Sequence, residues 1–407
     1  MKRRILFVDD EPSILDGLRR MLRGERNEWD MEFAVGGPAA VELIEQRTFD
    51  VVVSDMRMPI VDGAELVERV AAKSPRTVRI ILSGQAEEEA ILRSIGPAHQ
   101  FLSKPCTPEL LKHTIRRACC LHDRLDNVEL NGLLGKIRAL PSLPSVFGEI
   151  LAELNADEPS LIRIGELVAC DVGMSTKLLQ MINSGYFARA KRISDPRQAA
   201  QLLGLSLLRP LILSAGVFSA FPVERGNVFS IDLLLQHAAK VSAAAWRIAR
   251  AEGASPYVAE DAAFAGLVLD IGRLVYASYF PELTERVLHD SVERDEWLTQ
   301  TEVAEFGYTH ADLGASLLSL WAFPDSIVEA VAYHHTPGEC HATGFTPLTA
   351  VHVAEFMVNS CRLVPDGVLD PPSPPLDADY IAGLGLSSRI DKWRSLVLDF
   401  ICEKARS

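Results

Sequence analysis

Short, uninterrupted apolar runs alternate with helix-like segments through residues 1–120, and this alternation restricts the fold more than any other feature. A strand in which every residue is apolar must be covered on both faces, as the strands of a parallel sheet are. Between the runs, as in residues 13–22, apolar residues recur with helical spacing. The pattern predicts a doubly wound α/β domain with a five-stranded parallel sheet. The expected strands are residues 5–8, 31–35, 51–53, 78–82 and 100–102.

Reactive side chains stand at the ends of these strands. Asp9 and Asp10 follow the first strand, Asp55 the third, Ser83 the fourth and Lys104 the fifth. A doubly wound sheet brings these ends into one cleft. Three carboxylates in one cleft require a cation, and hard oxygen ligands suit Mg²⁺. The lysine would contact a phosphoryl oxygen as a point charge, the serine would donate a hydroxyl hydrogen, and Asp55 would be a carboxylate nucleophile.

A single Asp after a strand is most often a turn or cap residue. Asp55 alone, in "VVVSDMRMP", supports no more than that interpretation. The prediction of a reactive site rests instead on five suitable residues in order, each at the end of a strand.

Helical patterns dominate the rest of the chain. Residues 107–134 predict a helix with Thr107 as its N-cap and Pro108 in its first turn. Its apolar face either forms a short coiled coil between two copies or packs on its own domain, because two heptads do not decide. Residues 136–357 predict a separate all-α domain, and residues 358–407 a proline-rich loop followed by an amphipathic helix. The apolar face of the first helix contains Leu111, Ile115, Ala118, His122 and Leu125.

Charge and composition exclude several classes of protein. The 407 residues carry a formal net charge of -14, which argues against direct DNA binding through the phosphate backbone. The apolar run after the basic N-terminal residues is too short for a signal peptide. The apolar stretch 202–221 is interrupted by Arg209 and Pro210, so we expect no membrane span. The seven cysteines include no CxxC pair, as expected of reduced thiols in the cytoplasm.

Residues 1–120 resemble a response-regulator receiver domain, whose fold is flavodoxin-like. The segments "ILFVDDEP", "DVVVSDMRMPIVDG", "IILSG" and "FLSKP" carry the resemblance. It implies that a partner histidine kinase phosphorylates Asp55. It also implies that Asp10 and Asp55 bind Mg²⁺ directly, that Asp9 assists through water, and that the backbone carbonyl of Arg57 completes the protein ligands.

The same resemblance assigns the switch residues. Ser83 and Lys104 would contact the phosphoryl group, and Phe101 would rotate in response to phosphorylation. The bond between Lys104 and Pro105 would be a cis peptide, which is rare enough to be a placed feature.

Residues 136–357 resemble the HDOD domain, a relative of the HD phosphohydrolases that usually serves as a signalling output or binding module. The segments include "LPSLP", "LLLQHAAKVSAAAW", "FAGLVLDIGRLV", "FGYTHADLGASLLSLWAFP" and "AVAYHH". The HD pattern needs a histidine before its central aspartate, where this chain has Leu269, and the Gly-Tyr-Pro signature of the cyclic di-GMP phosphodiesterases is missing. The remaining positions of that pattern are His237, Asp270, His310, His334, His335 and Glu355.

Three interpretations of these histidines stay open. They are hydrogen-bonded core residues, or they line a remnant pocket that binds a ligand, or they form a working metal site. Because a leucine cannot ligate a metal, we expect no metal in the HDOD domain.

The sequence therefore predicts a cytoplasmic response regulator that relays phosphorylation of Asp55 to a non-catalytic HDOD output module. Its expected partners are a cognate histidine kinase, a downstream signalling protein and, where the helix 107–134 forms a coiled coil, a second copy. The alternative is a receiver-controlled, metal-dependent phosphodiesterase or phosphohydrolase of the HD type.

Overall fold

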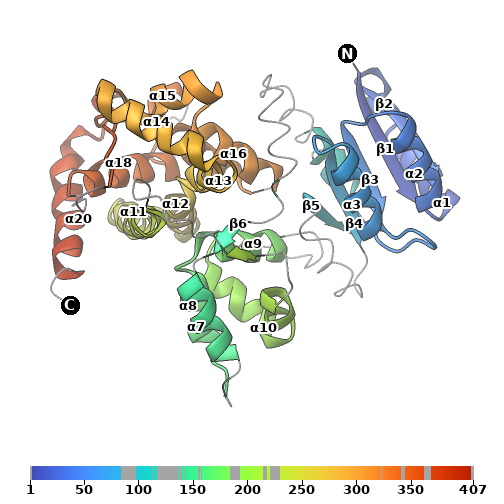
Figure 1. Cartoon of the computed structure of the whole chain (residues 1–407), viewed down its shortest axis with the longest axis horizontal. Coiled ribbons are helices and arrows are strands. Elements are labelled where there is room, and N and C mark those ends of the chain that lie inside the picture. The colour runs from blue at the N-terminus through green and yellow to red at the C-terminus, as the bar shows by residue number, and fades with distance from the viewer. Residues whose placement is uncertain are drawn as a thin grey trace.

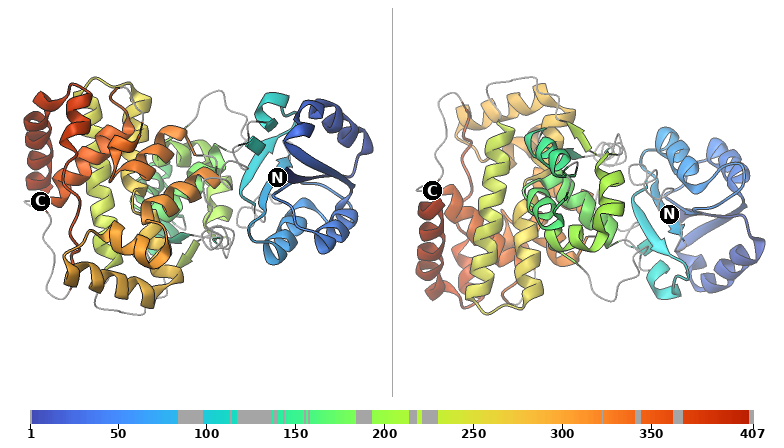
Figure 2. Two further views of the ribbon diagram at one scale, coloured as in Figure 1. Left: turned by 90° about the horizontal axis from the view of Figure 1, so that it is seen from above. Right: turned by 90° about the horizontal axis from the view of Figure 1, so that it is seen from below.

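The computed structural model describes residues 2–83, 98–112, 114–116, 137, 140–142, 144–154, 156, 158–183, 193–213, 218–220, 230–321, 323–340, 344–361 and 368–404. Two bodies are visible, an N-terminal α/β domain and a larger helical domain, with the C-terminal helix at the end remote from the first body (Figures 1 and 2).

The N-terminal domain contains a parallel sheet with the strand order β2-β1-β3-β4-β5. This arrangement confirms the five-stranded, doubly wound sheet predicted from the apolar runs. The strands are β1 (Arg3–Asp9), β2 (Trp29–Val35), β3 (Val51–Asp55), β4 (Val78–Ser83) and β5 (Gln100–Ser103). The helical segments between them are α1 (Pro12–Met21), η1 (Arg23–Asn27), α2 (Gly37–Gln46) and α3 (Gly63–Lys73).

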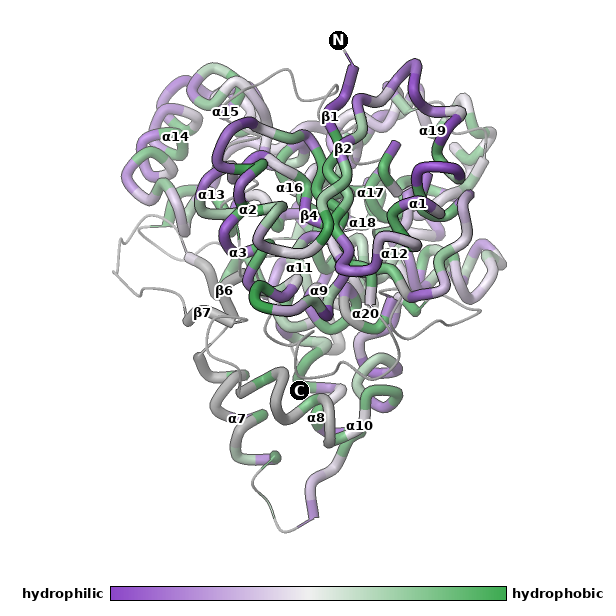
Figure 3. Tube along the Cα trace, turned by 90° about the vertical axis from the view of Figure 1, so that its right-hand side faces the viewer, coloured by the Kyte–Doolittle hydropathy of each residue, from purple (hydrophilic) through white to green (hydrophobic). Residues whose placement is uncertain are grey.

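Both faces of this sheet are buried. On β1, Ile5 and Phe7 belong to one cluster of buried apolar side chains, whereas Leu6 and Val8 belong to another. Alternate side chains of a strand point to opposite faces, so each face supplies one cluster. In Figure 3 the tube is hydrophilic near the N-terminus, at the start of β1, and largely hydrophobic further along the sheet. This double burial explains why the inner strands β1 and β3 contain continuous apolar runs in the sequence.

The second domain is mainly helical, as predicted. Its first helices are α7 (Pro144–Leu154), α8 (Leu161–Val168), α9 (Val172–Ile182), α10 (Pro196–Leu213), α11 (Ile231–Ala251) and α12 (Pro256–Val268). Then follow α13 (Ile271–Tyr279), α14 (Pro281–Arg294), α15 (Leu298–Phe306), α16 (His310–Leu320), α17 (Asp325–Tyr333), η3 (Pro337–Glu339) and α18 (Pro347–Asn359). The C-terminal segment adds α19 (Ala378–Gly383), η4 (Ser387–Arg389) and α20 (Ile390–Lys404).

Two short strands in this domain were not expected from the sequence. β6 (Leu140–Ser142) and β7 (Phe218–Ala220) pair in parallel with each other. Each has only three residues, and the first contains a proline, so neither produces a period-two signal. The predicted helix of residues 107–134 is observed at 108–112 and 114–116. Its coiled-coil face lies largely outside the described residues.

The C-terminal helix is fixed to the helical domain by a buried tryptophan. Trp393 of α20 is fully buried, and its indole N–H donates a hydrogen bond to Glu252 at the end of α11 over 3.0 Å. Arg389 and Lys392 form ion pairs with the same carboxylate. The amphipathic helix predicted after residues 387–388 is thus part of this domain. Within the part of the chain that the structure describes, no helix is long and apolar enough to cross a membrane.

The two domains meet at the edge strand β5. The side-chain amide of Gln100 donates to the carbonyl oxygen of Leu320, at the end of α16, over 2.9 Å. In the other direction, Gln180 of α9 donates to the carbonyl oxygen of His99 over 3.1 Å. Lys177 lies beside them, with its ammonium 4.6 Å from the ring centre of Trp321. All of these side chains are buried, so the contact is dry and defined by polar pairs.

Candidate functional site

Three of the predicted side chains meet at the carboxyl edge of the first sheet. Lys104 donates a hydrogen bond from its ammonium to Asp9 over 2.8 Å and forms an ion pair with Asp55. Both aspartates are buried, at 1% and 7% exposure. The ammonium bridges carboxylates from β1 and β3, so residues from three strands converge as the topology predicted. Burial alone would lower the pKa of Lys104, but the hydrogen bonds and charges of Asp55 and Asp9 outweigh it and raise that pKa.

The loop after Asp55 holds its carboxylate in position. The backbone N–H of Arg57 donates to Asp55 over 3.0 Å, and Asp62 caps α3 by accepting from the N–H of Glu65 over 2.8 Å. Gly63 begins α3 against this loop. A Cβ at Gly63 would lie 2.3 Å from the backbone oxygen of Asp55, so no larger residue fits there. The glycine that ends the motif is therefore a packing requirement of the site.

The remaining predicted residues lie around the same cleft. Asp10 is partly exposed after β1, and Ser83 is buried at the end of β4, where its backbone oxygen accepts a hydrogen bond from the N–H of Lys104. The bond between Lys104 and Pro105 is cis, as predicted. Phe101 is buried in β5, between the cleft and the domain contact at Gln100.

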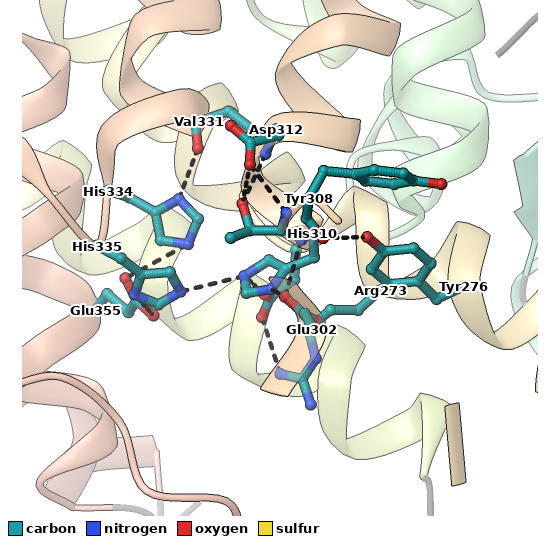
Figure 4. A network of polar contacts seen from close by, with 12 residues as sticks. Arg273, Tyr276, Glu302, Tyr308, His310, Asp312, Val331, His334, His335 and Glu355 are labelled. Atoms are coloured by element: carbon teal, nitrogen blue, oxygen red, sulfur yellow. Dashed lines mark hydrogen bonds and ion pairs between the residues drawn. The ribbon is translucent and has the colours of Figure 1, made fainter. Parts of the chain in front are cut away.

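A second group of polar residues lies inside the helical domain (Figure 4). Tight packing of α13 against α16 assembles it, because a Cβ at Gly272 would lie 2.1 Å from the carbonyl oxygen of His310. Thr309 caps α16 and fixes His310 in its first turn. Asp270 precedes α13 without capping it, and its carboxylate lies 3.3 Å from the Nε2 atom of His310. The sequence-predicted residues in this group are His237, Asp270, His310, His334, His335 and Glu355, all of which are buried or half-buried.

The histidines of this group contact one another. The Nε2 atoms of His310 and His335 are 3.1 Å apart, and the ring centres of His334 and His335 are 3.9 Å apart. Glu355 of α18 lies 3.9 Å from the Nε2 atom of His334 and 3.8 Å from the Nδ1 atom of His335. His237 and Asp270 line the same cavity as His310, His335 and Glu355.

Two members of the site were missed by the sequence reasoning. Glu302 of α15 is buried and accepts hydrogen bonds from both the backbone N–H and the Nδ1–H of His310, over 2.9 and 2.7 Å. Arg273, one turn after Asp270, forms an ion pair with it at 3.5 Å. The spacing of eight between Glu302 and His310 gives no periodic signal, because Gly307 reverses the chain between them in a left-handed conformation.

Burial and neighbouring charges shift the pKa values in this group in opposite directions. Burial opposes ionisation of Asp270, yet Arg273 and His310 lower its pKa to about 2. Burial would likewise lower the pKa of His310, but Glu302 raises it. For His334, burial and then the charge of His310 lower the pKa to about 3. Burial, followed by the charge of Asp270, raises the pKa of Glu355 well above its ordinary value.

Comparisons with known proteins identify both domains. The family model of the response regulator receiver domain matches residues 5–116, and that of the HDOD domain matches residues 140–337. An uncharacterized protein of Treponema pallidum is 27% identical over 256 residues, which cover 61% of this chain and 46% of that protein. The hydrogenase transcriptional regulatory protein HoxA of Cupriavidus necator is 33% identical over 142 residues, covering 33% of this chain and 26% of HoxA. The chain thus spans less than half of the length of these relatives.

Among solved structures, the MmoQ response regulator of Methylococcus capsulatus is 19% identical, with a TM-score of 0.47. The match covers 63% of this chain and 98% of that one. The sheet, its acidic cleft and the receiver match define a response regulator. More particularly, this chain belongs to the response regulators that join an N-terminal receiver domain to an HDOD domain.

Proposed function

We propose that this response regulator accepts a phosphoryl group on Asp55 from a histidine kinase and transmits the change to its HDOD domain. One carboxylate oxygen of Asp55 attacks the phosphorus of the kinase phosphohistidine. The new P–O bond forms as the P–N bond breaks, and the imidazole leaves with the bonding electron pair. The observation that carries the proposal is the position of Lys104. Its ammonium pairs with Asp9 of β1 and Asp55 of β3 just beyond one end of β5, and Gln100 at the other end of β5 contacts the HDOD domain.

The residues of the cleft fit a Mg²⁺ ion. The cleft already gathers positive charge between two buried carboxylates, and Asp10 adds a third, partly exposed one. Asp10 and Asp55 would bind the ion directly and Asp9 through water, with the backbone carbonyl of Arg57 as a further ligand. Bound Mg²⁺ would neutralise charge on the transferring phosphoryl group, while Lys104 and Ser83 contact its oxygens.

The relay runs along β5. Phosphorylation adds a charge of about −1.5 to −2 next to Lys104 and gives its ammonium a new partner. A shift of β5 at that end reaches the buried Phe101 and then Gln100, whose side chain bonds the carbonyl of Leu320. A buried hydrogen bond that loses its partner costs roughly 1–3 kcal/mol, so a shift of β5 that breaks this bond would change the stability of the domain contact.

The output of the HDOD domain is binding rather than hydrolysis. Leu269 is fully buried where the HD pattern has a ligating histidine. The cavity of about 30 Å³ beside Asp270 is far smaller than the sites that hold nucleotides, which are roughly 300 Å³ or more. We therefore propose that the HDOD domain binds a downstream signalling protein.

The first experiment is labelling with an acyl phosphate donor in the presence of Mg²⁺. We expect one labelled site in the wild type and none in Asp55→Asn. The matched control is Asp62→Asn in the same loop. Its side chain caps α3, and an asparagine oxygen can accept the same hydrogen bond, so this variant should label normally. Labelling of Asp55→Asn at the wild-type level would refute the assignment.

The second experiment tests the relay by hydrogen–deuterium exchange with and without beryllofluoride, which mimics the phosphoryl group. We expect altered exchange at the end of α16 and in α9, and loss of this response in Gln100→Ala. A response confined to the receiver domain would show that β5 does not transmit the change.

A further inference from the structure

One ring nitrogen from each of His310, His334 and His335 lies within 4.8 Å of those of the other two. The three residues come from two places in the sequence, the start of α16 and the end of α17. Their convergence inside the domain, beside two carboxylates, is what a bound cation would require.

The hydrogen bonds of the rings fix where their lone pairs point. His310 donates its Nδ1–H to Glu302 over 2.7 Å, and His334 donates its Nδ1–H to the carbonyl oxygen of Val331, also over 2.7 Å. Each neutral ring therefore presents an unprotonated Nε2 atom. Metal-binding histidines are oriented in this way, by a carboxylate or a carbonyl on the nitrogen that does not bind the metal.

A hydrogen-bonded core explains only part of this arrangement. His335 can donate from Nε2 to the Nε2 atom of His310, which would satisfy that pair at 3.1 Å. The Nε2 atom of His334 remains. It is fully buried and has no hydrogen-bond partner among the described residues. An unsatisfied buried acceptor costs roughly 1–3 kcal/mol, so a ligand that accepts its lone pair would stabilise the domain.

Carboxylates complete the set of ligands. Asp270 lies 3.3 Å from the Nε2 atom of His310, and Glu355 lies 3.9 Å from that of His334. The two acids offset the charge of a divalent ion. Three imidazoles with one carboxylate or water give the four-coordinate arrangement that first-row transition metals adopt in proteins.

The cavity beside this group is small, and its lining includes His310 and His335 but not His334. Its volume of about 30 Å³ is enough for an ion with one or two waters. Residues 371–374 of the proline-rich segment form part of its lining. The ring of His352 links this segment to the histidine cluster. It accepts a hydrogen bond from the backbone N–H of Asp377 over 3.0 Å and donates one to the carbonyl oxygen of His334 over 2.7 Å. The proline-rich segment, called the proline-rich cap below, is therefore connected through the side chain of His352 to the backbone of His334.

We propose that the HDOD domain binds one divalent transition-metal ion through His310, His334 and His335, with Asp270 or Glu355 as a further ligand, beneath the proline-rich cap. This departs from the expectation based on Leu269, because that residue removes one position of a two-metal pattern and leaves these three imidazoles intact. The covered site has no room for a phosphodiester beside the ion, so the metal holds α16, α17 and α18 together instead of hydrolysing a substrate.

The test uses the full chain, freed of metal by a chelator and titrated with Zn²⁺ in millimolar Mg²⁺ to saturate the receiver cleft. We expect about one zinc ion per chain by elemental analysis after gel filtration. Cobalt as a substitute should give the visible absorption of a four-coordinate ion with nitrogen ligands. His335→Ala should lose at least tenfold in zinc affinity, and Glu302→Ala roughly 10- to 100-fold, because no side-chain oxygen is left to orient His310.

Two control variants separate this site from other sources of binding. His289→Ala removes an exposed histidine outside the cluster and should bind zinc normally. Asp10→Ala disables the receiver cleft and should also keep its zinc, so the result does not depend on the proposed phosphorylation. Circular dichroism of the metal-free His335→Ala chain excludes misfolding. Equal zinc affinity in wild type and His335→Ala, or loss of zinc only in Asp10→Ala, would overturn the proposal.

Discussion

Lys177 provides a sharp test of the domain contact. Its ammonium is fully buried at the edge of the receiver domain, over the ring of Trp321 and 3.2 Å from the side-chain oxygen of Gln180. From the receiver, His99 lies close enough for the charge of Lys177 to lower its pKa, and Arg79 contacts the ring of His99. Burial lowers the pKa of Lys177 from its ordinary value of 10.5 to about 7. The closed contact thus holds a lysine that releases its proton far more readily than an exposed one.

The sign of the pH effect follows from proton counting. Between pH 7 and 10.5 the open state, in which water reaches Lys177, keeps a proton that the closed state has lost. Raising the pH in this window therefore stabilises the closed state, by at most about 1.4 kcal/mol per pH unit. The full effect is at most about 5 kcal/mol. Burial also lowers the pKa of His99, so acidification below pH 6.5 continues to favour opening.

Lys177→Met should abolish this dependence. Methionine keeps much of the volume and removes the buried charge, so the closed state should gain roughly 1–4 kcal/mol at pH 7. Hydrogen–deuterium exchange of residues 98–103, corrected for the chemical exchange rate, measures the opening free energy between pH 7 and 9. Lys240→Met, on the exposed face of α11, is the control and should retain the wild-type slope. Equal slopes in Lys177→Met and wild type would refute the reasoning.

Two further predictions concern stability. Gly63→Ala would place a carbon atom 2.3 Å from the backbone oxygen of Asp55 and should destabilise the receiver domain by roughly 1–3 kcal/mol in urea unfolding. In contrast, Gly17→Ala meets nothing within 4 Å in a helix and should stabilise it by up to about 1 kcal/mol. Trp393→Ala should cost roughly 3–5 kcal/mol in the helical domain, whereas Trp246→Ala, at a 43% exposed position, should cost much less in the same assay.

The receiver half was predictable because its signals are local. Continuous apolar runs identify strands buried on both faces, and the parallel topology alone brings their ends together. Asp9, Asp55 and Lys104 could therefore be placed in one cleft before any contact was known. The loop geometry was less accessible, since the role of Gly63 depends on how closely the chain returns to Asp55.

The helical half was predictable only in outline. Lys177 lies in an ordinary helical segment, "STKLLQ", where a lysine normally indicates an exposed face. Its burial depends on the receiver strand that packs beside it, which no local pattern encodes. Glu302 was missed for a related reason. Its hydrogen bond with His310 depends on the left-handed conformation of Gly307, which turns the chain between the two residues. Three-residue strands such as β6 are likewise set by tertiary contact.

Two elements that contact each other, β5 and α16, connect the receiver cleft to the proposed metal site. β5 carries Lys104 just beyond one end and Gln100 at the other, and α16 begins at His310 and ends at the Leu320 carbonyl that Gln100 contacts. A helix of this length spans about 16 Å, and its end cannot shift independently of its start. If metal binding fixes one end of α16, it must bias the contact at the other end.

Thermodynamic linkage makes this coupling testable from both sides. Beryllofluoride should change the zinc affinity of the full chain, and zinc should change the beryllofluoride affinity by the same factor, typically about 5- to 150-fold for coupled sites. Gln100→Ala, which removes the side chain between β5 and α16, should bring both factors towards one while both sites still bind. A factor of one in the wild type would mean that α16 does not carry the signal, even if each site binds its ligand as proposed.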